Sequence, residues 1–473
     1  MKIAIIGGGI SGLSAAYSLQ KEKNSGIPIE YTLFESAPRL GGVLNSEQVE
    51  DCLIEGGPDS FLTEKPWANQ LCAELGIADD LIGSNDADRK TYILVNKRLI
   101  AMPDGLMFMV PTKLIPTGLS PLFSWGTKFK MLLELLHPPR KVGHDETVAD
   151  MVRRHFGQEL VDRLADPLLS GVYGGTADSL SVRAVLPRFV DMENKYGSLT
   201  LAMIDARRKL ATMHKEKGSK PKPLFSSLKS GMQKMVDAVV ARLDANSLHT
   251  STTVHSIAPR GQAWEVRTEN GVEHFDGVIV AVPARIASRM LDSIDHQLAE
   301  DLGKVEYSSS ITMTLGYDME QLKGLPPGFG FLVPRTEGTR MLACTFVHNK
   351  FPNRAPAGKG LLRCFMGGAH DDNILELSDQ EITAIARREL KQILKLDAEP
   401  RFVRIYRWRA SMAQYTPGHL ERLERIDNTL AALPGLALAG NAFKGIGVPD
   451  CIRSGQDAAA KLAKLAKNTQ TVQ

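Results

Sequence analysis

The chain opens with an apolar, β-branched run, Lys2–Ile6, followed directly by Gly7-Gly8-Gly9-Ile10-Ser11-Gly12. Small and apolar residues continue from Leu13 to Leu19, and a second apolar run, Ile29–Phe34, ends on Glu35. This order predicts a strand, a glycine turn, a helix, a second strand and an acidic residue. It is the pattern of a Rossmann-like dinucleotide-binding unit, which places the chain in the α/β class.

Each glycine of this turn has its own expected role. Gly7 permits the tight turn, Gly9 lets the backbone approach a pyrophosphate, and Gly12 allows the helix to pack on the sheet. The free amides and positive end of the helix then face the phosphates. Glu35 is placed to accept hydrogen bonds from a ribose. The alternative is a tight strand–helix turn that binds no ligand.

A second glycine pair helps to separate the candidate cofactors. Arg39-Leu40-Gly41-Gly42 follows the second strand. Such a pair is typical of two-dinucleotide-binding flavoproteins, in which the chain passes close to the FAD phosphates, whereas a nicotinamide-binding domain does not require it. We therefore predict FAD from this family pattern, because spacing alone leaves NAD open.

Size and composition limit the remaining possibilities. The 473 residues suffice for two or three domains, and 43% hydrophobic with 23% charged residues is typical of a globular protein. A net charge of +3 does not favour nucleic-acid binding. Five scattered cysteines without a CxxC pair favour a reducing cytoplasm and no metal site. No apolar run reaches the ~20 residues of a membrane-spanning helix.

Three internal stretches lead to specific expectations. Pro103–Pro139 combines many Leu, Met and aromatic residues with few charges, which predicts either a helical subdomain with its own core or an apolar lid or membrane-contacting surface. Val148–Leu164 is expected to be an amphipathic helix that the glycines of Asp166–Gly175 interrupt. Arg207–Lys229 is basic and contains Pro and Gly, which predicts a solvated, mobile linker; the alternative is contact with an anionic surface or an acidic substrate.

The second half of the chain carries clear strand and helix signals. Asn270-Gly271 lies between alternating segments and predicts a hairpin, and Gly277–Pro283 is a continuous apolar strand. Ser378 with Glu381 forms a capping-box pattern before a helix. Near the C-terminus, Gly447-Val448-Pro449-Asp450 opens a helix whose positive end could face the flavin ring.

Together these residues resemble the FAD-dependent amine-oxidase-like superfamily and, within it, the bacterial protoporphyrinogen/coproporphyrinogen III oxidases of haem synthesis. The resemblance runs from end to end and is strongest to the Gram-positive type. It is carried by Ile5–Leu13, Glu35–Gly42, Glu55–Leu62, Pro167–Tyr173, Trp408–Tyr415 and Gly445–Cys451.

The resemblance implies a set of site residues. Residues implied to contact FAD are Gly7, Gly8, Gly9, Ile10, Ser11, Gly12, Glu35, Ser36, Arg39, Gly41, Gly42, Val43, Gly57, Pro58, Asp59, Ser60, Val254, Trp408, Gly440, Asn441, Val448, Pro449 and Asp450. Lys65 is implied to face a substrate propionate, although from the sequence alone it reads as a surface lysine. Gly171 and Val172 are implied to line the substrate cavity, with Tyr173 as a weaker candidate.

The resemblance also implies the chemistry and the partners. Hydride passes from a porphyrinogen to FAD, O2 reoxidises the flavin and yields peroxide, and the porphyrin product passes to a ferrochelatase. Gln414 precedes Tyr415 where monoamine oxidases carry a flavin-linking cysteine, so we expect non-covalent FAD. The sequence identifies no general base. The expected location is the cytoplasm, with at most peripheral contact at the inner face of the membrane.

The predicted architecture is a discontinuous FAD domain beside a mixed-sheet substrate domain with a helical insertion. The expected segments are 1–65, 225–285 and 405–468 for the FAD domain, 66–95 and 286–404 for the substrate domain, and 96–224 for the insertion. Three rivals stay open: an amine or amino-acid oxidase of the same fold, a non-enzymatic protein that chaperones prenylated GTPases, and a plain NAD dehydrogenase.

Overall fold

The structure is a computed structural model that describes residues 1–107, 109–140, 143–217 and 222–470. The chain divides into two compact units. The first comprises Met1–Gly83, Leu224–Glu306 and Glu421–Gln473, and the second comprises Ser84–Pro223 and Tyr307–Leu420. The finer division into six segments that we expected from the sequence stays a prediction.

A parallel five-stranded sheet forms the centre of the first unit. Its order is β12 (Leu248–His249), β2 (Glu30–Phe34), β1 (Lys2–Ile6), β16 (Gly277–Val280) and β22 (Leu436–Leu438). β1 is paired on both sides, with Ile3 opposite Tyr31 and opposite Gly277. A strand buried on both faces must be apolar throughout, and both β16 and nearly all of β1 are buried.

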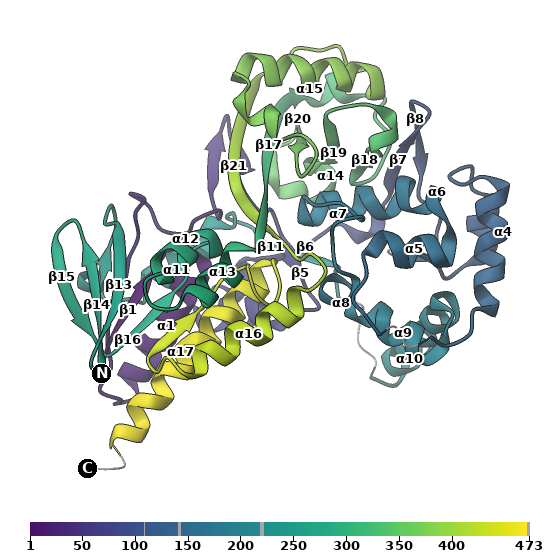
Figure 1. Cartoon of the computed structure of the whole chain (residues 1–473). Helices are drawn as coiled ribbons and strands as arrows, with labels where there is room; N and C mark the ends of the chain where they lie inside the picture. The colour runs from purple at the N-terminus through teal and green to yellow at the C-terminus, as the bar shows by residue number, and fades with distance from the viewer. Residues whose placement is uncertain (108, 141–142, 218–221, 471–473) are drawn as a thin grey trace. The chain divides into compact units, whose positions relative to one another are not determined.

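Helices of the first unit complete this core. α1 (Ile10–Asn24) lies beside α17 (Val448–Gln470), as Figure 1 shows, and Leu13, Leu19 and Leu462 are buried in the same cluster. The remaining helices are α2 (Pro66–Glu74), α11 (Gln233–Val240), α12 (Ala284–Leu291), α13 (His296–Gly303), α16 (His419–Ala431, which begins in the second unit), and the 3-10 turns η1 (Ala78–Asp80) and η5 (Ala245–Ser247).

Three small antiparallel sheets belong to the same unit. They comprise β13 (Val254–Arg260), β14 (Ala263–Thr268) and β15 (Gly271–Phe275); β5 (Phe61–Leu62), β11 (Phe225–Leu228) and β6 (Leu81–Gly83); and β3 (Ser46–Val49) with β4 (Cys52–Glu55). The hairpin predicted at Asn270-Gly271 is confirmed as the β14–β15 connection.

The second unit is built on a mixed seven-stranded sheet. Its order is β21 (Phe402–Gln414), β17 (Glu306–Asp318), β20 (Lys359–Gly367), β19 (Met341–Phe346), β18 (Gly330–Leu332), β7 (Thr91–Val95) and β8 (Arg98–Ala101). β18 and β7 are parallel, whereas β17–β20, β19–β20, β18–β19 and β7–β8 are antiparallel. The predicted mixed sheet is therefore confirmed.

One long helix covers part of this sheet (Figure 1). α15 (Asp379–Leu394) contributes Ile382, Ala386 and Leu390 to a core with sheet residues. Ser378 and Glu381 form the predicted capping box. Short elements fill the connections: α14 (Val347–Lys350) and the 3-10 turns η2 (Asp86–Asp88), η6 (Met319–Leu322), η7 (Arg335–Glu337), η8 (Pro352–Arg354) and η9 (Asp372–Glu376).

A helical region completes the second unit, and its core also includes Ile93 and Val95 of β7. Its elements are β9 (Leu106–Met107), β10 (Val110–Pro111), α3 (Leu114–Leu119), α4 (Trp125–Leu133), η3 (Glu134–Leu136), α5 (Val148–Phe156), α6 (Gln158–Leu160), the π-helical turn η4 (Val161–Ala165), α7 (Asp166–Tyr173), α8 (Val182–Val185), α9 (Pro187–Tyr196) and α10 (Leu199–Lys217). Leu122, Phe123 and Met131 are buried with Val148 and Phe156. Helices therefore form within Pro103–Pro139, as expected, but whether this stretch is a subdomain of its own stays a prediction, and residue 108 lies outside the described part.

Two local predictions were wrong. Val148–Leu164 is not one helix, because α5 ends at Gly157, which has a φ of +90°. The break expected within Asp166–Gly175 comes only at Gly174, where α7 (Asp166–Tyr173) ends. Pro167 lies in the first turn of α7, where a missing N–H is tolerated.

The second error concerns the basic stretch. Arg207–Lys217 is the second half of α10 and not a linker, because it consists of helix-forming residues without Gly or Pro. Phe225–Leu228 is strand β11, paired with β5 and β6. Residues 218–221 lie outside the described part of the chain.

Candidate functional site

The turn between β1 and α1 brings backbone and helix into close contact. Gly7 has a φ of +108°, and its N–H donates to the Phe34 carbonyl at 2.8 Å. A Cβ on Gly12 would lie 1.9 Å from the Gly7 carbonyl oxygen, so only glycine allows the helix to start this close to the strand. The local roles predicted for these two glycines are confirmed.

The N-terminus of α1 opens onto a space lined by glycine. Gly9 is the N-cap residue, and no side chain of the described residues caps the helix. A Cβ on Gly9 would meet no atom within 4 Å. The Gly41 N–H donates to the Gly8 carbonyl at 2.8 Å, which holds the Gly41-Gly42 pair against the glycine turn before α1. Uncapped amides beside open space fit the pyrophosphate of a dinucleotide.

Glu35 is held in place by the same turn. Its carboxylate accepts hydrogen bonds from the Gly8 N–H at 2.6 Å and the Ala37 N–H at 2.8 Å. The Ser36 hydroxyl lies 3.3 Å from the same carboxylate. An ionised carboxylate offers about four acceptor sites, so Glu35 can also accept from ribose hydroxyls.

Arg39 shapes the loop that contains Gly41 and Gly42. Its guanidinium donates to the carbonyls of Leu40 and Leu44 at 3.1 and 3.0 Å, and also to that of Gly42. Burial lowers the pKa of Arg39 from its ordinary value, and the charge of Glu35 opposes this shift. The side chain thus organises the loop that would contact FAD phosphates.

The other residues predicted to contact FAD divide between the two units. A Cβ on Gly57 would lie 1.9 Å from the Val43 carbonyl oxygen, and the Ser227 hydroxyl donates to the Asp59 carbonyl at 2.6 Å. Those in the first unit are Gly7–Gly12, Glu35, Ser36, Arg39, Gly41–Val43, Gly57–Ser60, Val254, Gly440, Asn441 and Val448–Asp450. Trp408 belongs to β21 of the second unit and stacks on Tyr406. Contact of these residues with FAD stays a prediction.

Lys65 has a partner that the sequence did not reveal. Its ammonium lies 2.5 Å from the Asp450 carboxylate, and both residues belong to the first unit. The side chain of Lys65 is 39% exposed and that of Asp450 is 9% exposed. No local spacing could show this pair, because its two members come from opposite ends of the chain.

Gly171 and Val172 lie on α7 in the second unit. Val172 is 59% exposed, and Leu332 is the nearest side chain to the position of a Cβ on Gly171. Gln414 fixes the end of this helix, because its amide donates to the Tyr173 carbonyl at 2.7 Å and to the Ser308 hydroxyl at 3.0 Å. The two predicted substrate residues therefore sit on an anchored helix, and their role stays a prediction.

A buried group of charged side chains in the helical region escaped the sequence analysis. His155 lies between the carboxylates of Glu134, at 3.0 Å, and Glu193, at 3.2 Å, and all three side chains are almost fully buried. Arg154 bridges Glu193 and Glu146 at 2.8 and 2.7 Å. The sequence feature that could have indicated this group is Glu134, the only acidic residue between Gly105 and Arg140.

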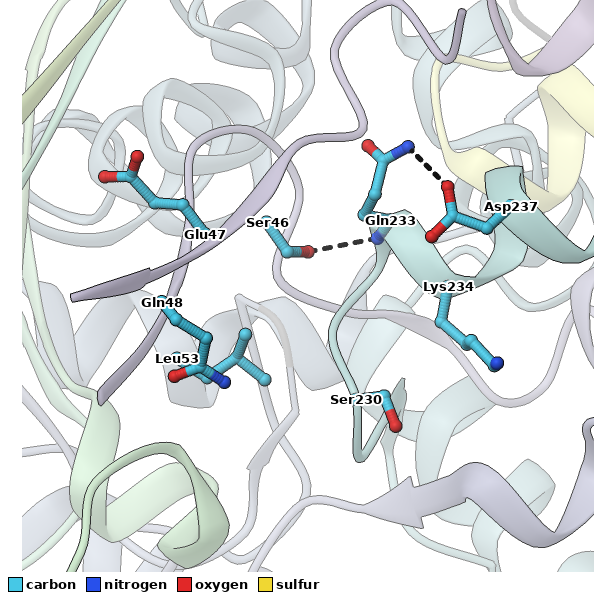
Figure 2. A pocket seen from close by; sticks show the side chains of 8 residues that line it. All are labelled: Ser46, Glu47, Gln48, Leu53, Ser230, Gln233, Lys234 and Asp237. Atoms are coloured by element: carbon cyan, nitrogen blue, oxygen red, sulfur yellow. Dashed lines mark hydrogen bonds between the residues drawn. The ribbon is translucent and has the colours of Figure 1, made fainter. Parts of the chain in front are cut away.

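A small polar cavity lies between the β3–β4 hairpin and α11 (Figure 2). Its volume is about 260 Å³, and it is lined by Ser46, Glu47, Gln48, Leu53, Ser230, Gln233, Lys234 and Asp237. The Gln233 N–H donates to the Ser46 hydroxyl at 3.0 Å. None of the predicted site residues lines it. It is too small and polar for a porphyrinogen, because ligand pockets usually measure about 300–1,000 Å³ and are mainly apolar.

All five cysteines are buried. Burial raises the pKa of Cys72 and of Cys451 to about 12, which disfavours the reactive thiolate. Across residues 1–107, 109–140, 143–217 and 222–470, no three His, Cys, Asp or Glu side chains are grouped to hold a metal ion.

Comparisons with known proteins agree with this geometry. Residues 10–463 match the family described as flavin containing amine oxidoreductase. A coproporphyrinogen III oxidase of Bacillus subtilis is 35% identical over 96% of both chains, and one of Staphylococcus aureus is 29% identical over 97% of this chain and 98% of its own. The solved structure of a protein from Exiguobacterium sp. 255-15, described as a protoporphyrinogen oxidase, superposes with a TM-score of 0.87 at 29% identity, covering 98% and 99% of the two chains.

The chain therefore belongs to the flavin-containing amine oxidoreductase family. It is an enzyme whose cofactor is FAD. The glycine-lined space at α1 and the orientation of Glu35 are the parts of this chain that fit the cofactor.

Proposed function

We propose that this enzyme oxidises coproporphyrinogen III to coproporphyrin III in haem biosynthesis, with O2 as the electron acceptor. The observation that carries the proposal is the similarity of 35% over 96% of both chains to the Bacillus subtilis coproporphyrinogen III oxidase. Protoporphyrinogen IX is the alternative substrate. On the same proposal, the porphyrin product passes to a ferrochelatase.

Different residues of the chain would bind the cofactor and the substrate. FAD, when bound, would accept hydride from the substrate and be reoxidised by O2 to give peroxide, in three rounds that together remove the six electrons of the oxidation. The uncapped amides of α1 hold the phosphates, and Glu35 holds the ribose. The Lys65 ammonium faces a substrate carboxylate, and the exposed side chain of Val172 contacts the apolar macrocycle.

Porphyrin fluorescence tests this proposal. The FAD-loaded protein is mixed in air with coproporphyrinogen III or with protoporphyrinogen IX, each beside an enzyme-free control for autoxidation. We expect fluorescence to appear faster than in the control, and faster with the four-carboxylate substrate. A preference for the two-carboxylate substrate would reverse the assignment. A yellow protein that exceeds neither control but oxidises an amine would replace it with the amine-oxidase rival.

We propose further that the enzyme contacts anionic membranes through the helical region. The apolar stripe comprises large side chains that α3, α4 and η3 leave exposed: Ile115, Leu119, Trp125, Phe129, Leu132, Leu133 and Leu136. Leu119, Trp125 and Leu136 are 80–81% exposed. Within the described residues, no helix is long and apolar enough to cross a bilayer, so the contact would be peripheral.

Charge supports a bilayer as the occupant of the apolar stripe. Lys113, Lys130 and Arg140 are exposed nearby, and the Lys128 ammonium lies 4.4 Å above the Trp125 ring. Glu134, the only acid between Gly105 and Arg140, is fully buried. An exposed apolar face bordered by cations fits the interface of an anionic membrane.

Vesicle co-sedimentation tests this surface. We expect binding to vesicles that contain phosphatidylglycerol and much weaker binding to phosphatidylcholine vesicles. The double variant Trp125→Ser/Leu136→Ser should weaken binding at least ~10-fold, because each buried apolar side chain contributes roughly 1.5–3 kcal/mol. Val272→Ser, on an exposed strand of the first unit, is the control. Equal sedimentation of the double variant and the unaltered protein would refute the proposal.

A further inference from the structure

The ion pair between Lys65 and Asp450 places an acid on the side chain that is proposed to bind a substrate carboxylate. Lys65 is the N-cap residue of α2, and Asp450 lies in the first turn of α17. Their charged atoms are 2.5 Å apart. In the described part of the chain, Asp450 is the only acidic partner of Lys65.

The two members of this pair differ in their freedom. A Cβ on Gly445 would lie 2.4 Å from the Asp450 Cγ, and one on Gly447 would lie 3.0 Å from its Oδ2, so the glycine loop closes over the carboxylate. Asp450 is 9% exposed, whereas Lys65 is 39% exposed. The carboxylate is thus held in place, and the ammonium reaches the surface of the unit.

We propose that Asp450 is a specificity-determining residue, the resident counter-ion of Lys65, which weakens the binding of carboxylates at this ammonium. The inference rests on the proposed function, because it takes Lys65 to bind a carboxylate of the substrate. A lysine ammonium has three donors, so a substrate carboxylate can bind beside Asp450 without displacing it. It then binds as the second anion on a single cation.

Like charges close together disfavour each other, so Asp450 opposes the attraction that Lys65 exerts on the incoming carboxylate. Water and salt do not fully screen the repulsion between the two carboxylates, because Asp450 is nearly buried. Small carboxylic acids, which have little apolar surface, are then not retained. A macrocycle that also buries apolar area is retained, and its oxidised product, with the same carboxylates, still dissociates.

Asp450→Asn gives the decisive test, because the amide keeps the size of the side chain and still accepts a hydrogen bond from Lys65. We expect KM for coproporphyrinogen III to fall about threefold to tenfold, equivalent to about 0.7–1.4 kcal/mol. The Kd of coproporphyrin III, measured by fluorescence titration without turnover, should fall by a similar factor. Both constants should depend more steeply on salt than in the unaltered protein.

A matched control comes from the same helix. Glu74 of α2 forms an ion pair with Lys21 at 2.6 Å, and both side chains are partly exposed. Glu74→Gln breaks this pair without touching the proposed site and should leave KM and Kd unchanged. Flavin absorbance must show equal FAD content in all variants, because Asp450 is also a predicted neighbour of FAD.

Each other outcome overturns the inference. A lower melting temperature with unchanged KM and Kd would mean that the pair only clamps α2 to α17. A raised KM would mean that Asp450 positions Lys65 for the substrate. Lys65→Gln, which still donates to Asp450, distinguishes a failure of the proposed function from a failure of this inference alone. If it leaves KM unchanged, the role of Lys65 in the proposed function fails; if it raises KM while Asp450→Asn does not lower it, only this inference fails.

Discussion

The N-terminus of α1 in the first unit and that of α10 in the second both present free N–H groups, but in the described part of the chain only α10 has a side chain that accepts hydrogen bonds from them. At α1, the N-cap residue is Gly9, and no side chain of the described residues caps the helix. At α10, the carboxylate of Glu134 accepts hydrogen bonds from the Leu199 and Thr200 amides at 2.6 and 3.3 Å. The Ser198 hydroxyl donates to the same carboxylate at 2.8 Å.

The difference shows which helix end is available for a ligand. Every helix begins with free N–H groups and partial positive charge, and both favour an anion. α10 is closed by a buried carboxylate of the protein itself, so its first turn is part of the structural core. α1 has glycine and open space at the same position, so an anionic ligand can complete it.

The largest expected effect comes from adding a side chain at Gly12, where α1 packs against the preceding turn. Gly12→Ala would place a Cβ 1.9 Å from the Gly7 carbonyl oxygen, so the turn must shift. We expect loss of bound FAD together with a large loss of stability, measured by flavin absorbance and thermal unfolding. Gly143→Ala, where a Cβ meets nothing within 4 Å, is the control. A yellow, stable Gly12→Ala protein would contradict the close packing of helix on strand.

Opening the closed helix end should have the next largest effect. Glu134→Ala removes the cap of α10 and leaves His155 beside only one carboxylate. Breaking a buried pair by removing one partner costs about 3–5 kcal/mol, which denaturant unfolding would measure. The control Asp150→Asn breaks the exposed pair with Arg153 and should change stability by about 1 kcal/mol or less. Equal losses for the two variants would show that Glu134 is not the essential cap.

Adding a side chain at the open N-terminus of α1 should weaken FAD binding without changing the stability of the fold. A Cβ on Gly9 meets no protein atom within 4 Å, so Gly9→Ala should leave the melting temperature of the FAD-free protein almost unchanged. The same methyl group occupies space predicted for the pyrophosphate. We expect FAD to bind at least ~10-fold more weakly, equivalent to about 1.4 kcal/mol, as fluorescence titration would measure. Unchanged affinity would place the phosphates elsewhere.

The smallest predicted effect is a pH dependence of the closed end. Burial alone would lower the pKa of His155, but the hydrogen bonds to Glu134 and Glu193 outweigh it and raise the pKa above 6.5. In contrast, although burial opposes it, hydrogen bonding to His155, Thr200 and Ser198 lowers the pKa of Glu134 below 4.5.

The direction of the effect follows from these shifts. A raised histidine pKa stabilises the fold fully below about 6.5, and this contribution is lost as the pH rises through the folded-state value. A lowered glutamate pKa stabilises above about 4.5, and its contribution is lost as the pH falls. We expect the stability difference between the protein and His155→Gln to be largest between about pH 4.5 and 6.5. Melting curves across pH measure it, and a difference that grows above pH 6.5 would contradict the charged state of His155.

Local patterns predicted much of the architecture. The turn at Gly7–Gly12, the hairpin at Asn270-Gly271, the buried strand β16 and the Ser378 capping box were all expected and are confirmed. In each, the determining residues are close together in the chain, so spacing alone carries the signal. The single helix expected at Val148–Leu164 and the linker expected at Arg207–Lys229 were wrong, because the effect of glycine or of a run of charges depends on the helix around it.

By itself, the sequence determined the class of nucleotide-binding unit, because a phosphate cradle is made of backbone whose geometry depends on glycines at fixed intervals. Only the tertiary structure decided which charged side chains meet. Asp450 became the partner of Lys65, and Glu134 the cap of α10, through packing that joins distant segments. Such pairs leave no periodic trace in the sequence, since a long-range contact depends on how whole elements pack together and not on the spacing of neighbouring residues.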